Sequence, residues 1–190
     1  MTPHERLGSL SVLACRAQAE IGTSVVHASR VVADALCEGG AVYVCGNGGS
    51  MAQALHFAAE LTGRYRLERG PLACVALGAD PAHATCVAND YDAELVFARQ
   101  LEALADAGDV LLCLTTSGRS PNVRAAADVA KRLGLPVVAV TGNGYESHWW
   151  RACSAHVSIP TADTALVQEL TLSVLHSICE HVDEVFGGES

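Results

Sequence analysis

Side chains that move protons or bind metal ions fall at regular spacing on two segments of this sequence. His56 and Glu60 are four residues apart, so they share one face of a helix. Gln168 and His176 are eight residues apart, which sets them roughly 80° from each other around a helix. A carboxylate beside an imidazole is suited to proton transfer at neutral pH. The same four side chains are also suited to binding Zn²⁺ or a similar divalent ion.

Ordinary structural roles also explain each of these four residues. A His–Glu pair at helical spacing is more often a surface pair than a catalytic one, and His176 is consistent with a hydrogen-bonded core histidine. Gln168 is consistent with an amide at a subunit interface. Spacing alone therefore leaves proton transfer, metal binding and a structural role open.

A glycine-rich loop has the composition of an anion-binding site. Residues 46–50 read Gly-Asn-Gly-Gly-Ser between an apolar run and a helical segment. Glycines let the backbone approach a ligand closely, and the following helix supplies free N–H groups. The loop lacks the last Gly of Gly-x-Gly-x-x-Gly and the Gly-Lys-Ser/Thr ending of a nucleotide-binding P-loop. A purely structural turn is an equally good interpretation.

A second loop is rich in hydroxyl groups. Four such side chains surround Gly118 directly before an expected helix: Thr115, Thr116, Ser117 and Ser120. Hydroxyls together with helix N–H groups can wrap a phosphate monoester. Ordinary helix capping by Ser117 or Ser120 is the alternative, but capping needs a single hydroxyl. The loop therefore favours phosphate binding over capping alone.

The elements that must position these residues alternate along the chain. Apolar periodicity and helix-start signals predict helices over 5–37, 51–62, 92–105, 121–133 and 164–186. Continuous apolar runs predict strands over 41–45, 72–77, 109–114, 136–141 and 155–159. Such alternation is typical of a parallel sheet covered on both faces. We therefore expect an α/β fold, a three-layer αβα sandwich around a central parallel five-stranded sheet, with both loops beyond strand C-termini.

No linker or low-complexity segment divides the chain, so residues 1–190 are expected to form a single domain. Residues 1–38 are expected to be an N-terminal oligomerisation helix, and 39–190 the sheet core and C-terminal helix. The two long terminal helices carry more apolar surface than a small sheet needs as cover. This surplus favours a symmetric oligomer.

The composition excludes several classes of protein. Lys and Arg number 12 against 21 Asp and Glu, a net charge of −9, which argues against nucleic-acid binding but not against one small anion. No membrane-length apolar stretch and no leader-like N-terminus are apparent, so we expect a cytoplasmic protein. The eight cysteines form no Cys-x-x-Cys, and most lie in apolar runs, which predicts buried free thiols.

Residues 46–50, followed by residues 54–64, which read ALHFAAELTGR, resemble the phosphoheptose isomerases, a family of sugar isomerase (SIS) domain proteins. Asn89-Asp90, the loop 115–120 and Gln168-Glu169 with His176 fit the same pattern in order. The resemblance covers nearly the whole chain. It implies the flavodoxin-like SIS fold and an enzyme of heptose biosynthesis. The implied reaction interconverts sedoheptulose 7-phosphate and D-glycero-D-manno-heptose 7-phosphate through an enediol.

The resemblance also implies roles for individual residues. Glu60 is expected to be the base that moves a proton between C1 and C2, and His176 its acid/base partner. The phosphate is expected to bind Thr115, Thr116, Ser117 and Ser120. The other expected substrate-binding residues are Asn47, Gly48, Gly49, Ser50, Glu60, Arg64, Asn89, Asp90 and Gln168. One Zn²⁺ per subunit is expected at His56, Glu60, Gln168 and His176, with no nucleotide or organic cofactor.

The family pattern further implies a homotetramer with sites at subunit interfaces, and neither nucleic acid nor a membrane as partner. The sequence departs from the pattern at Leu166, Thr171 and Arg119, where relatives often carry Arg, His and Asn. An isomerase of another ketose phosphate remains open. A non-catalytic sugar-phosphate sensor or protein-binding scaffold of the same fold is the other alternative. Glu60 together with His176 favours the enzyme, because a scaffold needs neither.

Overall fold

The computed structural model describes residues 2–143 and 149–187. Five parallel strands form one sheet in the order β2-β1-β3-β4-β5. The strands are β1 (Val42–Gly46), β2 (Cys74–Ala76), β3 (Val110–Thr115), β4 (Val137–Gly142) and β5 (Ala155–Ile159). The helices are α1 (Pro3–Cys37), α2 (Gly49–Thr62), α3 (Pro81–Asp90), α4 (Val96–Leu104), α5 (Pro121–Arg132) and α6 (Thr164–Phe186). Two short 3₁₀ helices, η1 (Ala93–Leu95) and η2 (Trp149–Ala152), complete the described elements.

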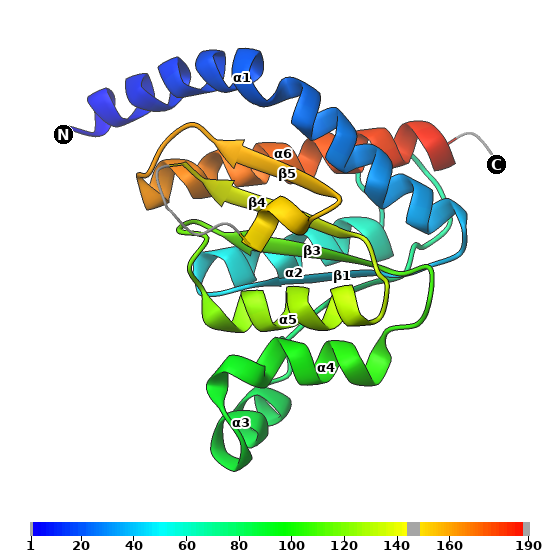
Figure 1. The fold of residues 1–190 in the computed structure, drawn as a ribbon. Coiled ribbons are helices and arrows are strands. Elements are labelled where there is room, and N and C mark those ends of the chain that lie inside the picture. Colours follow the sequence, from blue (N-terminus) through cyan, green and yellow to red (C-terminus); the bar gives the residue numbers. More distant parts are fainter. Residues whose placement is uncertain (1, 144–148, 188–190) are drawn as a thin grey trace.

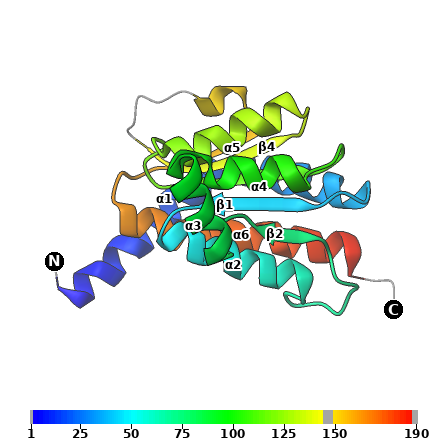
Figure 2. The same cartoon turned by 90° about the horizontal axis from the view of Figure 1, so that it is seen from below.

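Helices cover both faces of the sheet, as the apolar strands predict (Figures 1 and 2). On one face, Val44 and Leu112 pack in a core with Leu175 of α6, together with α1 and α2. On the other face, Leu111 and Cys113 pack with residues of α4 and α5. Neighbouring residues of a strand point to opposite faces, so a run such as β3 is apolar throughout. The expected three-layer sandwich with a five-stranded parallel sheet is therefore confirmed.

The two loops of interest leave the sheet at the same edge. β1 and β3 are central neighbours, with Cys45 opposite Cys113 and Gly46 opposite Leu114. The strand order reverses between β1 and β3, because the chain continues outward to β2 from one and to β4 from the other. Ligands of doubly wound sheets bind in the crevice beyond the strand C-termini at such a reversal. The fold therefore places the loops 46–50 and 115–120 at that crevice.

Helix α1 is long and only partly supported by the rest of the chain. The side chains of Thr2 and Glu5 form a reciprocal capping box that starts it. Its N-terminal part projects beyond the sheet in Figure 1, and Leu7 and Val12 are 70% and 73% exposed there. No helix in the described part of the chain is long and apolar enough to cross a membrane.

Helix α3 was not predicted, and the expected helix over 92–105 is instead the 3₁₀ turn η1 followed by α4. Helix α3 packs on η1 and α4, outside the sheet layers (Figure 1). Val87 is its only buried residue, so apolar periodicity is weak there. The sequence nevertheless contains a helix-start signal. The side chain of Asp80 accepts the N–H of Ala82 at 2.8 Å, and Pro81 occupies the first turn.

The prediction of buried free thiols is right for half of the cysteines. All eight are free, and Cys45, Cys74, Cys113 and Cys179 are buried. Cys15, Cys37 and Cys86 are exposed, and Cys153 is half-buried. The exposed thiols lie on the outer faces of helices α1 and α3. The apolar runs in the sequence do not show which face of these helices is exposed.

Candidate active site

The Ser/Thr loop, residues 115–120, is a tight turn in which the hydroxyls of Thr115 and Ser120 meet. The buried Oγ1 of Thr115 lies 3.1 Å from Oγ of Ser120 and accepts the N–H of Gly118 at 3.2 Å. Gly118 has φ +64°, and a Cβ there would lie 2.3 Å from the ring of Trp150. Only glycine fits this position, so the turn is fixed by both backbone conformation and packing.

The first turn of α5 adds an incompletely capped helix N-terminus to this loop. Ser120 is the N-cap of α5, yet its side chain makes no capping hydrogen bond. Ser117 instead accepts the N–H of Arg119, at 3.2 Å, within the loop itself. The alternative that these serines serve only to cap the helix is therefore wrong. The hydroxyls lie at the positive end of a helix dipole, which favours an anion.

The glycine loop, residues 46–50, is held against both α5 and α6. Gly48 has φ +55° and precedes α2 without a side-chain cap. A Cβ on Gly49 would lie 2.4 Å from Nε2 of Gln168, so glycine here lets the Gln168 side chain pack on the loop. Asn47 and Asn122 exchange two amide hydrogen bonds of 2.8 Å. The loop, the first turn of α5 and Gln168 are therefore neighbours.

The residues expected to transfer protons lie between α2 and α6. Nε2 of His56 lies 2.9 Å from Nε2 of His176, and 3.5 Å from Oε1 of Glu60. The ring of Tyr65, which the sequence analysis did not single out, lies 5.3 Å from that of His176 between centroids. The side chains of His56 and Glu60 are 41% and 22% exposed. The spacing on α2 was predicted, whereas its contact with His176 depends on how the helices pack.

A buried ion pair braces the helix turn that carries Glu60. Nε of Arg69 binds Oδ1 of Asp183 at 3.0 Å, with side chains only 1% and 4% exposed. Nη2 of Arg69 also donates to the backbone carbonyl of Glu60, at 2.8 Å. Burial opposes ionisation of Asp183, but the amides of Leu67 and Arg66 and the Arg69 guanidinium together outweigh it, so its pKa lies below its ordinary value. Sequence analysis missed this pair, because 114 residues separate its members.

Three further expected site residues lie at or just beyond the C-terminal ends of α2 and α3. Asn89 and Asp90 end α3, where the Asn89 amide donates to Asp90 at 2.7 Å and Cys86 donates to the same carboxylate at 3.5 Å. Arg64 follows the end of α2, and its exposed guanidinium lies 3.8 Å from Glu68. Within the described residues, none of these polar contacts reaches the Ser/Thr loop or the pair formed by His56 and His176.

Of the three departures from the family pattern, the structure explains the one at Thr171. Thr171 is buried, and its Oγ1 donates to the carbonyl of Val167 at 2.8 Å within α6. It therefore faces the core and not the crevice. Leu166, in the first turn of α6, is half-buried against the core. Arg119 is exposed.

The donor types near His176 fit zinc, but their arrangement is that of a hydrogen-bonded set. Two imidazoles and a carboxylate are common zinc ligands. Among the described residues, however, no group of three or more His, Cys, Asp or Glu side chains is arranged to hold a metal ion. Gln168 packs on Gly49, about 12 Å along α6 from His176 at 1.5 Å per residue. Of the four expected ligands, His56 contacts both Glu60 and His176, and Gln168 lies about two turns away along α6.

Comparisons with known proteins agree with this geometry. Residues 9–142 match the family model described as the SIS domain. The chain is 46% identical over 165 residues to a phosphoheptose isomerase of Campylobacter concisus, covering 87% of each chain. It is 47% identical over 165 residues to a phosphoheptose isomerase of Mycobacterium bovis, covering 84% and 83%. A solved phosphoheptose isomerase from Francisella tularensis superposes with a TM-score of 0.89 at 31% identity, covering 97% of this chain and 100% of that one.

Proposed function

The chain belongs to the SIS domain family and, within it, to the phosphoheptose isomerases, and from that premise we propose that it interconverts sedoheptulose 7-phosphate and D-glycero-D-manno-heptose 7-phosphate. The observation that carries this proposal is the contact of His176 with the His56–Glu60 pair. A carboxylate and an imidazole from two packed helices form an acid/base set of the kind that aldose–ketose exchange requires.

The reaction moves one proton between two carbons and a second between two oxygens. From the ketose, Glu60 removes the proton on C1 while the carbonyl oxygen on C2 is protonated, which gives the enediol. Glu60 then returns a proton to C2, and the hydroxyl on C1 loses its proton to become the aldehyde. His176 serves as the acid/base group for the oxygens. Stabilising the developing enediolate lowers the barrier to removing a weakly acidic C–H.

The Ser/Thr loop binds the phosphate in this proposal. Hydroxyls of Thr115, Thr116, Ser117 and Ser120 and the N-terminus of α5 surround the dianion. The phosphate is remote from the reacting carbons, so its binding energy serves to orient the other end of the sugar. The hydroxyls of the sugar are assigned to Asn47, Gly48, Gly49, Ser50, Arg64, Asn89, Asp90 and Gln168.

A homotetramer with shared sites is the assembly that we infer. A groove of about 410 Å³ runs between α1 and α6, lined chiefly by small and apolar side chains that include Ile21, Val25, Leu170 and Val174. Val26 beside it is 51% exposed. A second copy of the chain is the proposed occupant, because the same helix α1 projects beyond the sheet with Leu7 and Val12 exposed. Light scattering on the purified chain tests this: a fourfold mass supports the tetramer, and a monomer contradicts it.

Zinc is the metal that we infer for this site, at one ion per subunit. His56, Glu60, Gln168 and His176 are the ligands that would hold it, and a bound ion would polarise the oxygens of the substrate. Metal content is the direct readout: we expect about one zinc per chain in the wild type and substantial loss in His56→Ala. An equal zinc content in both proteins would contradict these ligands.

The enzyme is favoured over a sensor or scaffold because the relatives at 46% and 47% identity are named isomerases. The test is incubation with sedoheptulose 7-phosphate, followed by NMR detection of an aldoheptose phosphate, with and without chelator. Conversion supports the proposal. Absence of conversion under both conditions, in a protein that still binds the sugar phosphate, would favour the sensor.

A further inference from the structure

A basic groove lies next to the Ser/Thr loop, and Gly118 and Arg119 of that loop line part of it. Its main cavity, of about 360 Å³, lies between α5 and η2 and is lined by Arg124, Asp128, Lys131, Val137, Trp149 and Arg151, among others. A smaller hollow of about 200 Å³ shares Arg124 and Trp149 with it and adds Arg119. Cavities of this size class accommodate small organic ligands. None of the expected catalytic or substrate-binding residues lines either hollow.

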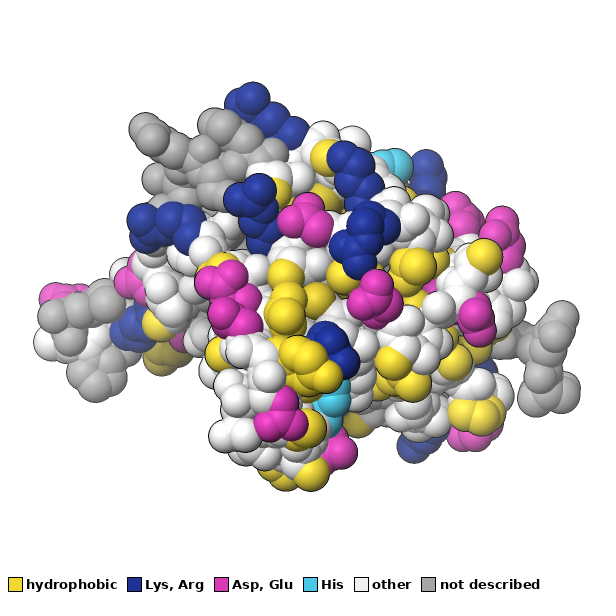
Figure 3. Space-filling view, turned by 60° about the horizontal axis from the view of Figure 1, so that its bottom comes forward, with side chains coloured by type: hydrophobic (Ala, Val, Ile, Leu, Met, Phe, Trp, Pro, Cys, Tyr) yellow, Lys and Arg dark blue, Asp and Glu magenta, His cyan; other side chains and the backbone are white. Residues whose placement is uncertain are grey.

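Positive charge is concentrated at this groove in an otherwise acidic chain. Arg119, Arg124, Lys131 and Arg151 make up four of the 12 basic residues, although the chain carries a net charge of −9. Asp128 is the only acidic residue among those lining it, and it lies 3.8 Å from Arg124. Lys131 and Arg151 form no ion pair with any residue that the structure describes. Figure 3 shows basic side chains gathered over this part of the surface.

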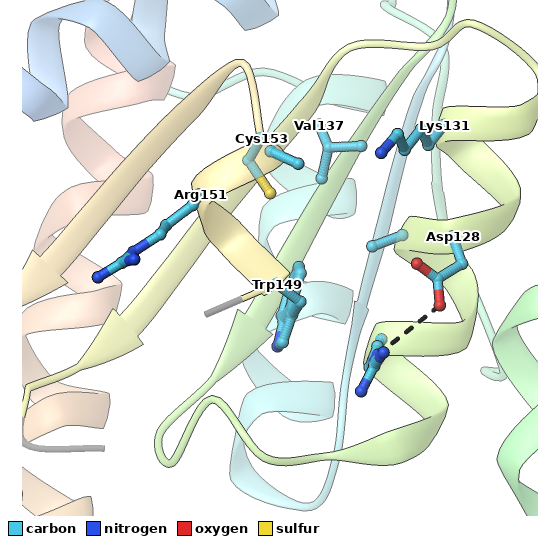
Figure 4. Close-up of a pocket in the computed structure, with 9 residues that line it drawn as sticks. Asp128, Lys131, Val137, Trp149, Arg151 and Cys153 are labelled. Atoms are coloured by element: carbon cyan, nitrogen blue, oxygen red, sulfur yellow. Dashed lines mark ion pairs between the residues drawn. The ribbon is translucent and has the colours of Figure 1, made fainter. Parts of the chain in front are cut away.

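The cavity also contains a fixed aromatic ring. Figure 4 shows Trp149 standing between η2 and α5, with Lys131 on the opposite wall and Arg151 extending from the outer side of η2. The indole N–H of Trp149 donates to the carbonyl of Gly118 at 2.8 Å, and its ring meets that of Trp150 in a T-shaped contact at 5.8 Å. These two contacts hold the ring in place before any ligand binds.

We propose that this basic groove binds a phosphorylated small molecule with a flat ring, the chemistry of a nucleotide, as a second ligand distinct from the sugar substrate. Arginine and lysine side chains pair with phosphate oxygens. An indole face offers a stacking surface for a planar base. Inorganic phosphate would leave the ring unused, and a long polyanion would need a longer track of cations. Because Trp149 holds Gly118, the ligand lies directly behind the Ser/Thr loop.

Of the two tryptophans of the chain, Trp149 lines this groove and Trp150 contacts Trp149, so intrinsic fluorescence reports on this region. We would titrate the intact protein with ADP and follow fluorescence and calorimetry in parallel. A saturable change at one ADP per chain is expected, with adenosine and inorganic phosphate each binding at least tenfold more weakly. Lys131→Gln, a change at an exposed residue and the only lysine of the chain, is expected to weaken ADP at least tenfold.

Arg132→Gln is the matched control, because it removes the neighbouring charge from the last turn of α5 outside the groove, where Arg132 pairs with Glu102 at 3.0 Å. Less than a twofold change in ADP affinity is expected for it. An equal loss of ADP affinity in both variants would show that only the overall charge matters, and it would overturn the proposal. So would the absence of saturation, or complete displacement of ADP by sedoheptulose 7-phosphate, which would place ADP in the Ser/Thr loop.

Discussion

The Ser/Thr loop and the α2–α6 helix pair contribute to the same proposed site by different structural means. In the loop, a short turn after a buried strand gathers several hydroxyls, and Thr115 and Ser120 lie 3.1 Å apart. Between the helices, single side chains face each other, with His56 and His176 at 2.9 Å, above the buried pair of Arg69 and Asp183. In the proposed function, the loop offers several hydroxyls for one phosphate, whereas each proton-transfer step depends on a single side chain.

This difference predicts how the two regions respond to substitution. A dianion that several donors share loses only part of its binding when one hydroxyl is removed. A proton shuttle fails when its base is removed, whatever surrounds it. We therefore expect losses in kcat from the helix pair and graded losses in KM from the loop.

The largest effect is expected from Glu60→Gln. The amide keeps the shape of the side chain but cannot accept the proton, so kcat should fall about 10³- to 10⁴-fold. Binding of the sugar phosphate, measured by calorimetry, should change little. Glu102→Gln on α4, an exposed carboxylate on the other face, is the matched control and should leave kcat unchanged. Near-normal turnover of Glu60→Gln would contradict the assignment of Glu60 as the catalytic base.

The second effect concerns the brace beneath the helices. Asp183→Asn leaves Arg69 buried and unpaired, so the free energy of unfolding should fall by about 3–5 kcal/mol in denaturant titrations. Glu180→Gln on the same helix, which breaks an exposed pair with Arg66, should cost at most about 1 kcal/mol. Equal losses in the two variants would show that the Arg69–Asp183 pair has no special role.

The same carboxylate gives a pH dependence with a definite sign. The folded pKa of Asp183 lies below its ordinary value, so its stabilising contribution is present above the unfolded pKa, about 3.9, and is lost as pH falls through the folded pKa. Asp183→Asn should therefore remove part of the fall in stability between neutral and acidic pH. If the difference in free energy of unfolding between wild type and Asp183→Asn stayed constant over this pH range, the predicted sign of the pH dependence would be contradicted.

The architecture was predicted correctly wherever a single helix or strand shows its own pattern of apolar residues. Strands buried on both faces are continuous apolar runs, so β1, β3 and β4 were predicted almost to the residue. The edge strand β5, whose apolar residues alternate with polar ones, was predicted with the same bounds. Likewise, the shared face of His56 and Glu60 follows from helical spacing. Helix α3 was missed because it buries little, and β2 proved shorter than its apolar run.

What could not be predicted depends on contacts between distant segments. The meeting of His56 with His176 needs the packing of α2 on α6, and the Arg69–Asp183 pair joins a loop to the last helix. Thr171 departs from the family pattern, and its burial on α6 could not be predicted from its neighbours in sequence. The basic groove around Trp149 joins α5 to η2 and was not visible in any single motif.

A third effect is expected from His176→Gln. Loss of the imidazole removes the acid/base group for the oxygens, so kcat should fall about 10²-fold or more with a smaller change in KM. Steady-state kinetics on the variant separate the two parameters. An effect confined to KM would make His176 a binding residue and would weaken the contrast with the loop.

The smallest effect is expected from the loop itself. Ser120→Ala removes one of several hydroxyls from the proposed phosphate site, so KM should rise about tenfold while kcat stays within a fewfold of the wild type. Thr85→Ala, which removes an exposed hydroxyl from α3, is the control and should alter neither. A loss in kcat as large as that of His176→Gln would mean that the loop is not redundant.

The central claim is that Glu60 moves a proton between C1 and C2 of a heptose 7-phosphate, and its most direct test is isotope exchange. Sedoheptulose 7-phosphate would be incubated with the enzyme in D₂O through many turnovers and followed by NMR. The account predicts that wild-type enzyme forms the aldose with deuterium at C2, and that Glu60→Gln forms none on the same timescale. An aldose product free of deuterium, or equal labelling by Glu60→Gln, would contradict it.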